Sequence, residues 1–304
     1  MLDPQPNFRP VPGIAVDLAP GLRRVLAPNP SPMTYRGTNS YLLGTRDIAV
    51  IDPGPDDPTH LEAILRAVLP GQKVTQILVT HAHLDHAPLA RTLSHETGAP
   101  VLAFGPPEAG RSPIMQALAE GELMGGGEGV DSAFVPDHPL ADGDVVQGSD
   151  WQVEALHTPG HMANHLSFAW GDVLFSGDLV MGWASSLVSP PDGDLTAFMA
   201  SLTRLQGRRW SQFHAGHGAP IRDPAARLAE LLAHRRAREA AILAALSDGP
   251  ATARSLADRI YTDTLPALLP AAARNVLAHL IDLTENSHVA PEGILSADAV
   301  FFRL

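Results

Sequence analysis

The stretch THAHLDHAPL, residues 80–89, places His81, His83, Asp85 and His86 directly after the apolar run 77–79. Buried polar side chains need partners, and ordinary packing does not supply them for four such residues in so short a stretch. Neutral imidazole and carboxylate are ligands for divalent metals, and a loop that curls after a strand can bring several to one point. The spacing sets His81 beside His83 and turns Asp85 and His86 to the other side of the same turn. The stretch therefore predicts a site for two adjacent metal ions at the end of a buried strand.

Three further stretches present a ligand at the predicted end of a strand. TPGH at 158–161 presents His161, SGD at 176–178 presents Asp178, and HAGHG at 214–218 presents His217 between glycines that let the backbone approach closely. Each stretch alone is weak support, because an isolated histidine or aspartate is usually an ordinary polar residue. Together, and in this order, they extend the predicted site to several strand ends. The neighbouring His157 and His214 are assigned to structure.

The composition bounds the metal chemistry and the partners. The chain of 304 residues has no cysteine, so any metal must use histidine and carboxylate ligands, and a reducing cytoplasm is the expected location. No apolar run is long enough to span a membrane, and the N-terminal stretch lacks the pattern of a signal peptide, so no membrane partner is expected. The formal net charge of −12 argues against a polyanionic partner such as duplex DNA.

Alternating strand and helix patterns predict an α/β domain over residues 1–222. The stretches 38–43 and 48–52 predict a hairpin that turns at 44–47, and 14–16 with 24–26 predict an edge strand pair. Asp57 and Pro58 predict a helix start, with Asp57 as the N-cap. Further strands are predicted at 76–80, 101–104, 151–156, 166–169, 173–176 and 211–213, and further helices at 88–97, 114–123 and 195–205. The glycine-rich stretch 125–129 is interpreted as a loop, since no Lys-Ser or Lys-Thr follows it.

Residues 223–304 have a helical character. Helices at 224–245, 252–260 and 271–283, followed by short strands at 286–291 and 299–304, predict a winged helix. The region carries 8 arginines and 10 acidic residues, a net charge of −2. Affinity for duplex DNA depends largely on neutralising phosphates, so we do not expect this region to bind it. We hypothesise that the region packs on the first domain and shapes one wall of the substrate entrance, or mediates self-association into a homo-oligomer.

On these stretches the chain resembles the metallo-β-lactamase fold superfamily. The resemblance covers about residues 20–222 and rests on VIDPG around Asp52, THAHLDH, TPGH, SGD and AGHG. It implies an αββα sandwich of two mixed sheets with outer helices and a site at one edge. It also implies the residue roles: His81, His83 and His161 for the first metal, Asp85, His86 and His217 for the second, Asp178 bridging both, and Asp52 as a carboxylate that steadies the ligands from behind.

The aspartate at 178 narrows this resemblance. Many true β-lactamases have cysteine at the bridging position, whereas Asp178 matches glyoxalase II-like and nuclease-like branches. An oxygen bridge accepts zinc, manganese or iron, and zinc is the default expectation for both ions.

The whole chain is similar to the beta-lactamase-like protein 2 branch, a metal hydrolase domain followed by a winged helix. GTNSYLLG at 37–44, PPDGDLTAFMASLTRL at 190–205 and HRRAREAAILAAL at 234–246 carry this similarity. Animal members of the branch are mitochondrial endoribonucleases, so single-stranded RNA is the partner that the similarity implies.

The expected function is therefore a dinuclear metal-dependent hydrolase. Two dications lower the pKa of a water between them, and the hydroxide attacks a phosphodiester or an ester. Asp85 orients the nucleophile or moves its proton, and His165 assists the leaving group or packs behind the site. Asn39, Ser185 and Ser186 are predicted to form the substrate wall. Two alternatives stay open: a glyoxalase II-like hydrolase of an ester or thioester, and a DNA-binding regulator that uses the winged helix.

Overall fold

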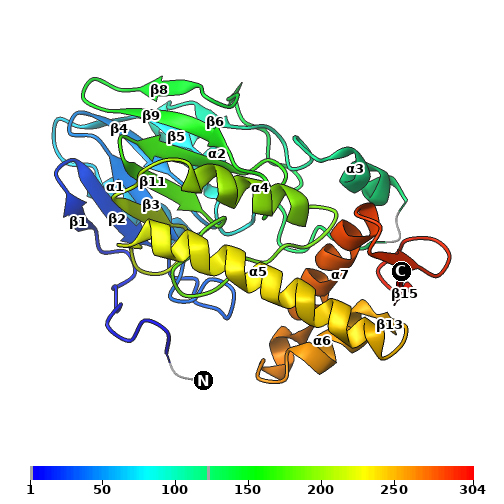
Figure 1. The fold of residues 1–304 in the computed structure, drawn as a ribbon. Helices are drawn as coiled ribbons and strands as arrows, with labels where there is room; N and C mark the ends of the chain where they lie inside the picture. Colours follow the sequence, from blue (N-terminus) through cyan, green and yellow to red (C-terminus); the bar gives the residue numbers. More distant parts are fainter. Residues whose placement is uncertain (1–2, 122–123) are drawn as a thin grey trace.

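The computed structural model describes residues 3–121 and 124–304 of the chain (Figure 1). Within these residues two mixed β-sheets lie face to face. The first sheet is antiparallel from β1 to β4 and parallel from β4 to β7, with the strands in sequence order. Its strands are β1 (Val16–Ala19), β2 (Leu22–Leu26), β3 (Asn39–Leu43), β4 (Asp47–Ile51), β5 (Lys73–Leu78), β6 (Val101–Ala103) and β7 (His138–Pro139).

The second sheet has the order β12-β11-β10-β9-β8. Its strands are β8 (Val145–Gln147), β9 (Gln152–His157), β10 (Leu166–Trp170), β11 (Val173–Gly177) and β12 (Gln212–Ala215). All neighbours are antiparallel except β11 and β12, so β9, β11 and β12 run in the same direction. Their carboxyl ends therefore lie at one edge of the sheet.

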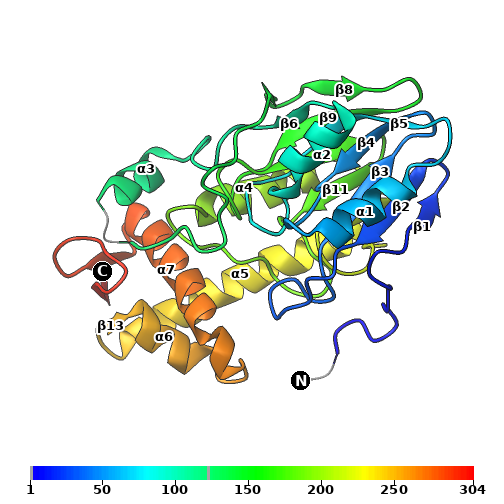
Figure 2. The ribbon, with the colours of Figure 1, turned by 180° about the vertical axis from the view of Figure 1, so that it is seen from behind.

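Helices cover both outer faces of the sandwich (Figures 1 and 2). The helices α1 (Pro58–Ala67) and α2 (Leu89–Thr97) pack on the first sheet. The helices α4 (Leu195–Gln206) and α5 (Pro224–Ser247) pack on the second. This arrangement confirms the predicted αββα sandwich.

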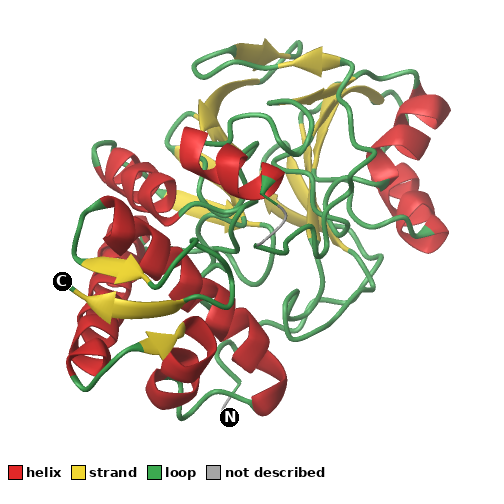
Figure 3. Ribbon diagram, turned by 90° about the vertical axis from the view of Figure 1, so that its right-hand side faces the viewer, coloured by secondary structure: helices red, strands yellow, loops and turns green. Residues whose placement is uncertain are grey.

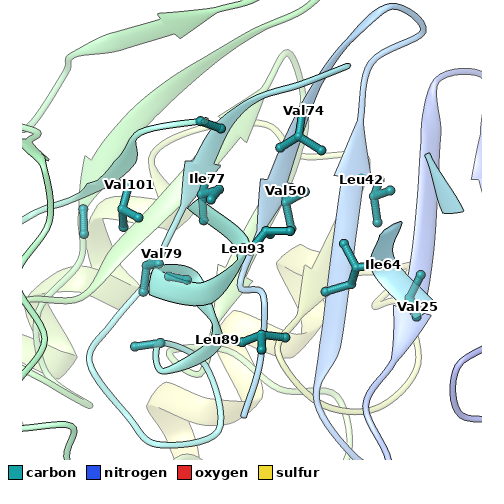
Figure 4. Packing of buried hydrophobic residues seen from close by; sticks show 14 of the residues in the cluster. Val25, Leu42, Val50, Ile64, Val74, Ile77, Val79, Leu89, Leu93 and Val101 are labelled. Atoms are coloured by element: carbon teal, nitrogen blue, oxygen red, sulfur yellow. The ribbon is translucent and has the colours of Figure 1, made fainter. Parts of the chain in front are cut away.

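Side chains on both faces of β4 are buried, which explains why the sequence of this strand is a continuous apolar run. Ile48 and Val50 pack towards α1 and α2, whereas Ala49 and Ile51 pack towards the second sheet. Figure 4 shows Val50 beside Leu93 in the first of these layers. Successive residues of a strand point to opposite faces, and here both faces are buried.

Local signals set the ends of α1 and α2. The Asp57 carboxylate accepts hydrogen bonds from the backbone N–H of Thr59 (2.7 Å) and His60 (3.0 Å), as an N-cap does. Gly98 ends α2 in the left-handed conformation, with φ of 72°. The hairpin between β3 and β4 also forms as predicted.

Other elements differ from the predictions. The first strand lies at Val16–Ala19 rather than 14–16, and the short edge strands β7 and β8 were not predicted. Helix α3 is Pro113–Glu120, and the predicted continuation of this helix onto residues 122–123 lies outside the described residues.

The C-terminal region is a winged helix, as predicted. Three helices pack with a small sheet of the order β13-β15-β14, which Figure 3 shows beside them. The elements are α5, β13 (Ala251–Thr252), α6 (Ala253–Ile260), the short 3₁₀ helix η1 (Pro266–Leu268), α7 (Leu269–Glu285), β14 (Val289–Pro291) and β15 (Val300–Arg303). Helix α7 is longer than the predicted 271–283.

Helix α5 belongs to two hydrophobic cores. Near its start, Leu228 and Leu231 pack with α4 and the second sheet. Near its end, Ile242 and Leu246 pack with α6, α7 and Met115 of α3. The boundary proposed between residues 222 and 223 therefore falls at the start of a helix that both parts share. Among the described residues, no helix is long and apolar enough to cross a lipid bilayer.

The shared helix predicts that the two parts unfold together. Ile242→Ala removes a fully buried side chain from the C-terminal core, which should cost about 2–5 kcal/mol. All four tryptophans, at positions 151, 170, 183 and 210, precede α5. We therefore expect the thermal midpoint to fall equally when tryptophan fluorescence and helical circular dichroism are followed. Arg236→Ala, at an exposed position of α5, is the control; two separate transitions in the Ile242→Ala variant would contradict the expectation.

Candidate metal centre

The carboxyl ends of several strands bring the predicted ligands together. Strand β5 leads into His81, β9 leads to His161, β11 ends before Asp178, and β12 leads to His217. The backbone N–H of Leu166 donates to the carbonyl of Thr80 (2.7 Å) and so ties the two sheets at this edge. All seven predicted ligands belong to groups whose donor atoms lie within 4.8 Å of one another.

One group consists of three imidazoles. The Nδ1 atom of His83 lies 2.9 Å from Nε2 of His81 and 3.0 Å from Nε2 of His161. Burial is the main cause that lowers the pKa of each of these histidines, which favours the neutral imidazole. Three neutral nitrogens that face one point form the donor set of a divalent metal.

A second group consists of Asp85, His86 and His217. The Oδ2 atom of Asp85 lies 3.1 Å from Nε2 of His217 and 3.4 Å from Nε2 of His86. Asp178 lies between the two groups, since its carboxylate is 3.2 Å from His217, 3.5 Å from His86 and 3.8 Å from His161. A carboxylate in this position can contact ions in both groups.

Four of these imidazoles give their outer N–H to an oxygen and turn the other nitrogen inwards. The outer Nδ1 contacts are His81 to Thr80 Oγ1 (2.9 Å), His86 to Asp52 Oδ2 (3.0 Å), His161 to the Leu187 carbonyl (2.7 Å) and His217 to the Gly37 carbonyl (3.1 Å). The Thr80 hydroxyl donates to Asp52, so it accepts from His81. Such contacts fix the tautomer that leaves the inner nitrogen free to bind a metal.

The carboxylates make the second group attract positive charge. Burial opposes the charged imidazole of His217, but Asp178 and Asp85 outweigh it and raise its pKa to about 9. Burial likewise opposes the charged form of Asp178, but His217 and His86 lower its pKa well below the ordinary value. The buried Oδ1 atom of Asp178 has no hydrogen-bond partner among the described residues. These donors fit divalent cations, which would supply the charge that the carboxylates require.

Asp52 and Gly216 shape the site from behind. Asp52 accepts hydrogen bonds from the backbone N–H (2.7 Å) and hydroxyl (2.8 Å) of Thr80, as well as from His86. Its φ of 51° lies in the left-handed region, which aims the carboxylate at both partners. A Cβ atom at Gly216 would lie 2.5 Å from Asp178 Oδ1, so only glycine allows this approach.

His165 does not line the cavity above the ligands, and its contacts match the predicted alternative, in which it packs behind the site. Its Nε2 accepts a hydrogen bond from the backbone N–H of Asp178 (3.2 Å), and its Nδ1 contacts Thr158 Oγ1 (3.0 Å). The side chain is fully buried. It therefore supports the backbone of Asp178. His214, assigned to structure, packs against the rings of Tyr41 and Phe175, which also contact each other.

The residues predicted for the substrate wall do not line the cavity that opens above the ligands. Asn39 is fully buried and donates to the carbonyls of Ala215 (3.1 Å) and Gly218 (2.9 Å). Ser186 is buried and its hydroxyl donates to the carbonyls of Asp178 and Leu179. Neither these two residues nor Ser185 line the cavity above the ligands.

A cavity of about 530 Å³ opens above the ligands. Apolar side chains form much of its wall, namely Met33, Leu84, Met181 and Leu187. Another part of the wall comes from α7, through Pro270, Ala271 and Arg274. Asp85 faces the cavity with a quarter of its side chain exposed, whereas Asp178 is nearly covered. No local sequence pattern predicts that these residues line the cavity, because they come from segments far apart in the sequence.

The chain is similar to known proteins over both regions. The model of the Metallo-beta-lactamase superfamily matches residues 33–217, and that of the Beta-lactamase associated winged helix domain matches residues 252–295. The chain is 30% identical over 290 residues to a Beta-lactamase-like protein 2 homolog of Drosophila melanogaster, covering 92% of each protein. It is 28% identical over 244 residues to an atrochrysone carboxyl ACP thioesterase of Cryptosporiopsis sp., covering 79% of this chain and 67% of that protein.

A solved structure matches along nearly the whole chain. The crystal structure of a metallo-beta-lactamase family protein from Thermus thermophilus superposes with a TM-score of 0.76 at 29% identity, covering 95% of this chain and 100% of that one. These similarities confirm the resemblance drawn from the sequence motifs.

The position of Asp178 between the two groups predicts its effect on metal content. Two groups of ligands should hold about two ions per chain. Asp178→Ala should reduce zinc bound after dialysis to about one ion or fewer, since both groups lose a contact. His214→Ala removes a nearby buried imidazole that faces neither group, and should keep the full content. Elemental analysis checks both variants; equal loss from the two would mean that His214 also binds metal.

Proposed function

Because the chain belongs to the metallo-beta-lactamase superfamily and is therefore a hydrolase, we propose that it cleaves acyl thioesters or esters with an apolar acyl group, using two divalent metal ions. His81, His83 and His161 would hold one ion, Asp85, His86 and His217 the other, and Asp178 would contact both. Such ions polarise the carbonyl under attack and lower the pKa of water. Zinc suits this mixture of imidazole and carboxylate, and manganese or iron would also fit it.

Asp85 is the carboxylate best placed to act on the attacking water. It lines the cavity, and its Oδ2 atom also lies 3.4 Å from the hydroxyl of Thr38. A carboxylate at a cavity surface can orient a water molecule and accept its proton, and the side chain of Asp178, which also lines the cavity, is 9% exposed against 25% for Asp85. We assign orientation of the nucleophile to Asp85.

The apolar wall of the cavity is the observation that carries the choice of substrate. An acyl chain gains about 25 cal/mol per Å² of apolar surface that it buries. Met33, Leu84, Met181 and Leu187 offer such a surface next to the ligands. The relative named as a thioesterase acts on an acyl group carried by a protein, and its similarity supports the thioester as the reacting group.

The same cavity argues against single-stranded RNA as the substrate. Binding of single strands relies on aromatic side chains that stack on bases and on basic side chains along the backbone. None of the described residues that line the cavity is aromatic apart from histidine, and Arg274 is the one arginine or lysine among them. Arg204 and Arg208 do not line the cavity. Each forms an ion pair, with Asp142 (2.7 Å) and Glu154 (2.6 Å) respectively, so their charges are already partnered within the protein.

The placement of α7 argues against a DNA-binding regulator. In helix-turn-helix proteins the second helix of the motif enters the major groove. Here that helix is α7, whose first turns line the cavity through Ala271 and Arg274 and whose Ala278 packs in the core with α4 and the second sheet. The surface that would read DNA therefore faces the hydrolase domain. We propose that α7 forms one wall of the substrate site.

The proposed substrate predicts the outcome of a parallel activity screen. Zinc-loaded protein should hydrolyse an acyl thioester with an apolar chain at a kcat/KM at least about tenfold above that for bis(p-nitrophenyl) phosphate, single-stranded RNA or a β-lactam. Protein treated with a chelator should be inactive on all four and recover with zinc. Faster cleavage of RNA than of the thioester would overturn the proposal and favour an endoribonuclease.

The cavity wall predicts a change in chain-length preference. Phenylalanine in place of Ala271 would fill part of the cavity, so Ala271→Phe should lower kcat/KM for a long acyl chain about tenfold more than for an acetyl group. Ala267→Phe places the same side chain at an exposed position outside the cavity and should keep the wild-type ratio. Equal ratios in the two variants would exclude Ala271 from the substrate wall.

A further inference from the structure

The segment 186–188 lies directly behind two of the proposed ligands. The carbonyl of Leu187 accepts the hydrogen bond of His161 Nδ1 (2.7 Å), which leaves Nε2 of His161 pointing at His83. The hydroxyl of Ser186 donates to the backbone carbonyl of Asp178 and to that of Leu179 (3.0 Å). The position of this segment therefore sets the orientation of the His161 imidazole and of the backbone that carries Asp178, the carboxylate that would contact both ions.

Two residues of the C-terminal region hold the same segment from its other side. Arg235 of α5 donates from Nη2 to the carbonyl of Ser186, and from Nη1 to Oδ1 of Asn275 on α7 (3.0 Å). The same Oδ1 atom accepts the backbone N–H of Val188 (3.0 Å). Arg235 and Asn275 thus hold the residues on either side of Leu187, and they also hold each other.

Arg235 is an unusual residue to bury. It is 2% exposed, and among the described residues no carboxylate lies within 4.0 Å of its guanidinium. Its positive charge instead lies over the ring of Phe198, 5.0 Å from the centroid, and contacts two neutral oxygens. Burying an arginine without an acidic partner costs several kcal/mol, and an apolar side chain of similar size would pack there at lower cost. What an apolar side chain cannot do is donate to two acceptors on separate segments in a fixed plane.

We propose that Arg235 and Asn275 are positioning residues for the metal centre: they fix segment 186–188, and through it the orientation of His161 and Asp178. The proposal rests on the metal centre described above and is independent of the substrate. It gives the winged-helix region a second role besides forming a cavity wall. Contacts behind metal ligands commonly change metal affinity by about 10–100-fold, and we expect an effect of this size.

The Asn275 position offers a matched pair of variants. Asn275→Asp keeps an oxygen that can accept from both Val188 and Arg235, whereas Asn275→Leu removes both acceptors at similar volume. Zinc affinity is measured by competition with a chelator on the full chain, without substrate. We expect Asn275→Leu to bind at least one ion about 10–100-fold more weakly and Asn275→Asp to stay near the wild-type affinity.

Arg235 is tested against another arginine of the same helix. Arg238 lies over the ring of Tyr261 (4.4 Å) and donates to the carbonyl of Ile260 (3.3 Å), so it contacts only the C-terminal region. Arg235→Met should weaken zinc binding, and Arg238→Met should lower the thermal midpoint without changing zinc affinity. The visible spectrum of the cobalt-substituted protein should change in Arg235→Met and not in Arg238→Met, because the ligand geometry changes in the former alone.

The outcomes separate the possible failures. Equal zinc affinity in Asn275→Leu and Asn275→Asp would overturn the proposal, and this pair decides the question if Arg235→Met does not fold. Equal affinity in Arg235→Met and Arg238→Met would also overturn it. A wild-type chain that takes up no zinc, manganese or iron would instead refute the metal centre itself. Failure of the thioester screen would leave these binding results unaffected.

Discussion

The geometry of the candidate metal centre depends on which oxygen accepts the outer N–H of each buried imidazole. Oxygens of Thr80, Asp52, Leu187 and Gly37 each contact the Nδ1 of one histidine, which leaves four lone pairs directed at a common centre. Two carboxylates and several imidazole nitrogens meet at this centre, so it favours positive charge, which also raises the pKa of His217 to about 9 despite its burial. Thr80 and Asp52 follow strands β5 and β4 of the first sheet, and Gly37 and Leu187 lie in loops that reach the same edge. The arrangement of strand ends is therefore the part of the fold that the chemistry requires.

Sequence reasoning succeeded where the signal is local. The ligand loop follows a buried strand, Asp57 caps its helix, and β4 alternates between two buried faces, so each could be read from neighbouring residues. It failed where orientation depends on distant segments. His165 and Ser186 lie close to the ligands in sequence, yet their polar atoms point to the backbone of Asp178 and away from the cavity. The contact of Leu187 with His161 had no signal at all, since any residue type has a carbonyl.

Under our proposal, the C-terminal region is a fold associated with DNA that serves another purpose, as a wall of the substrate site. Helix α7 has the position of the DNA-recognition helix in the motif. One face of α7 is buried in apolar contacts, and its first turns line the cavity. Arg274 follows the same logic: its guanidinium donates to Ser189 (2.8 Å) and to the carbonyls of Met124 and Pro190, so it braces loops around the cavity. The net charge of −2 in this region is consistent with a surface that meets protein and not phosphate.

Helix α5 has a consequence for how the two regions can diverge. The matches to known families end at residue 217 and resume at residue 252, so the helix lies in neither, although it packs in both cores. Each residue added to a helix turns everything beyond it by about 100°. One inserted residue after Leu232 would thus rotate Arg235 away from Ser186 and turn Ile242 out of its core. The phase and the length of α5 therefore tie the geometry of the proposed metal centre to that of the winged helix, since even a whole inserted turn, which restores the phase, would move the C-terminal core about 5.4 Å along the helix axis.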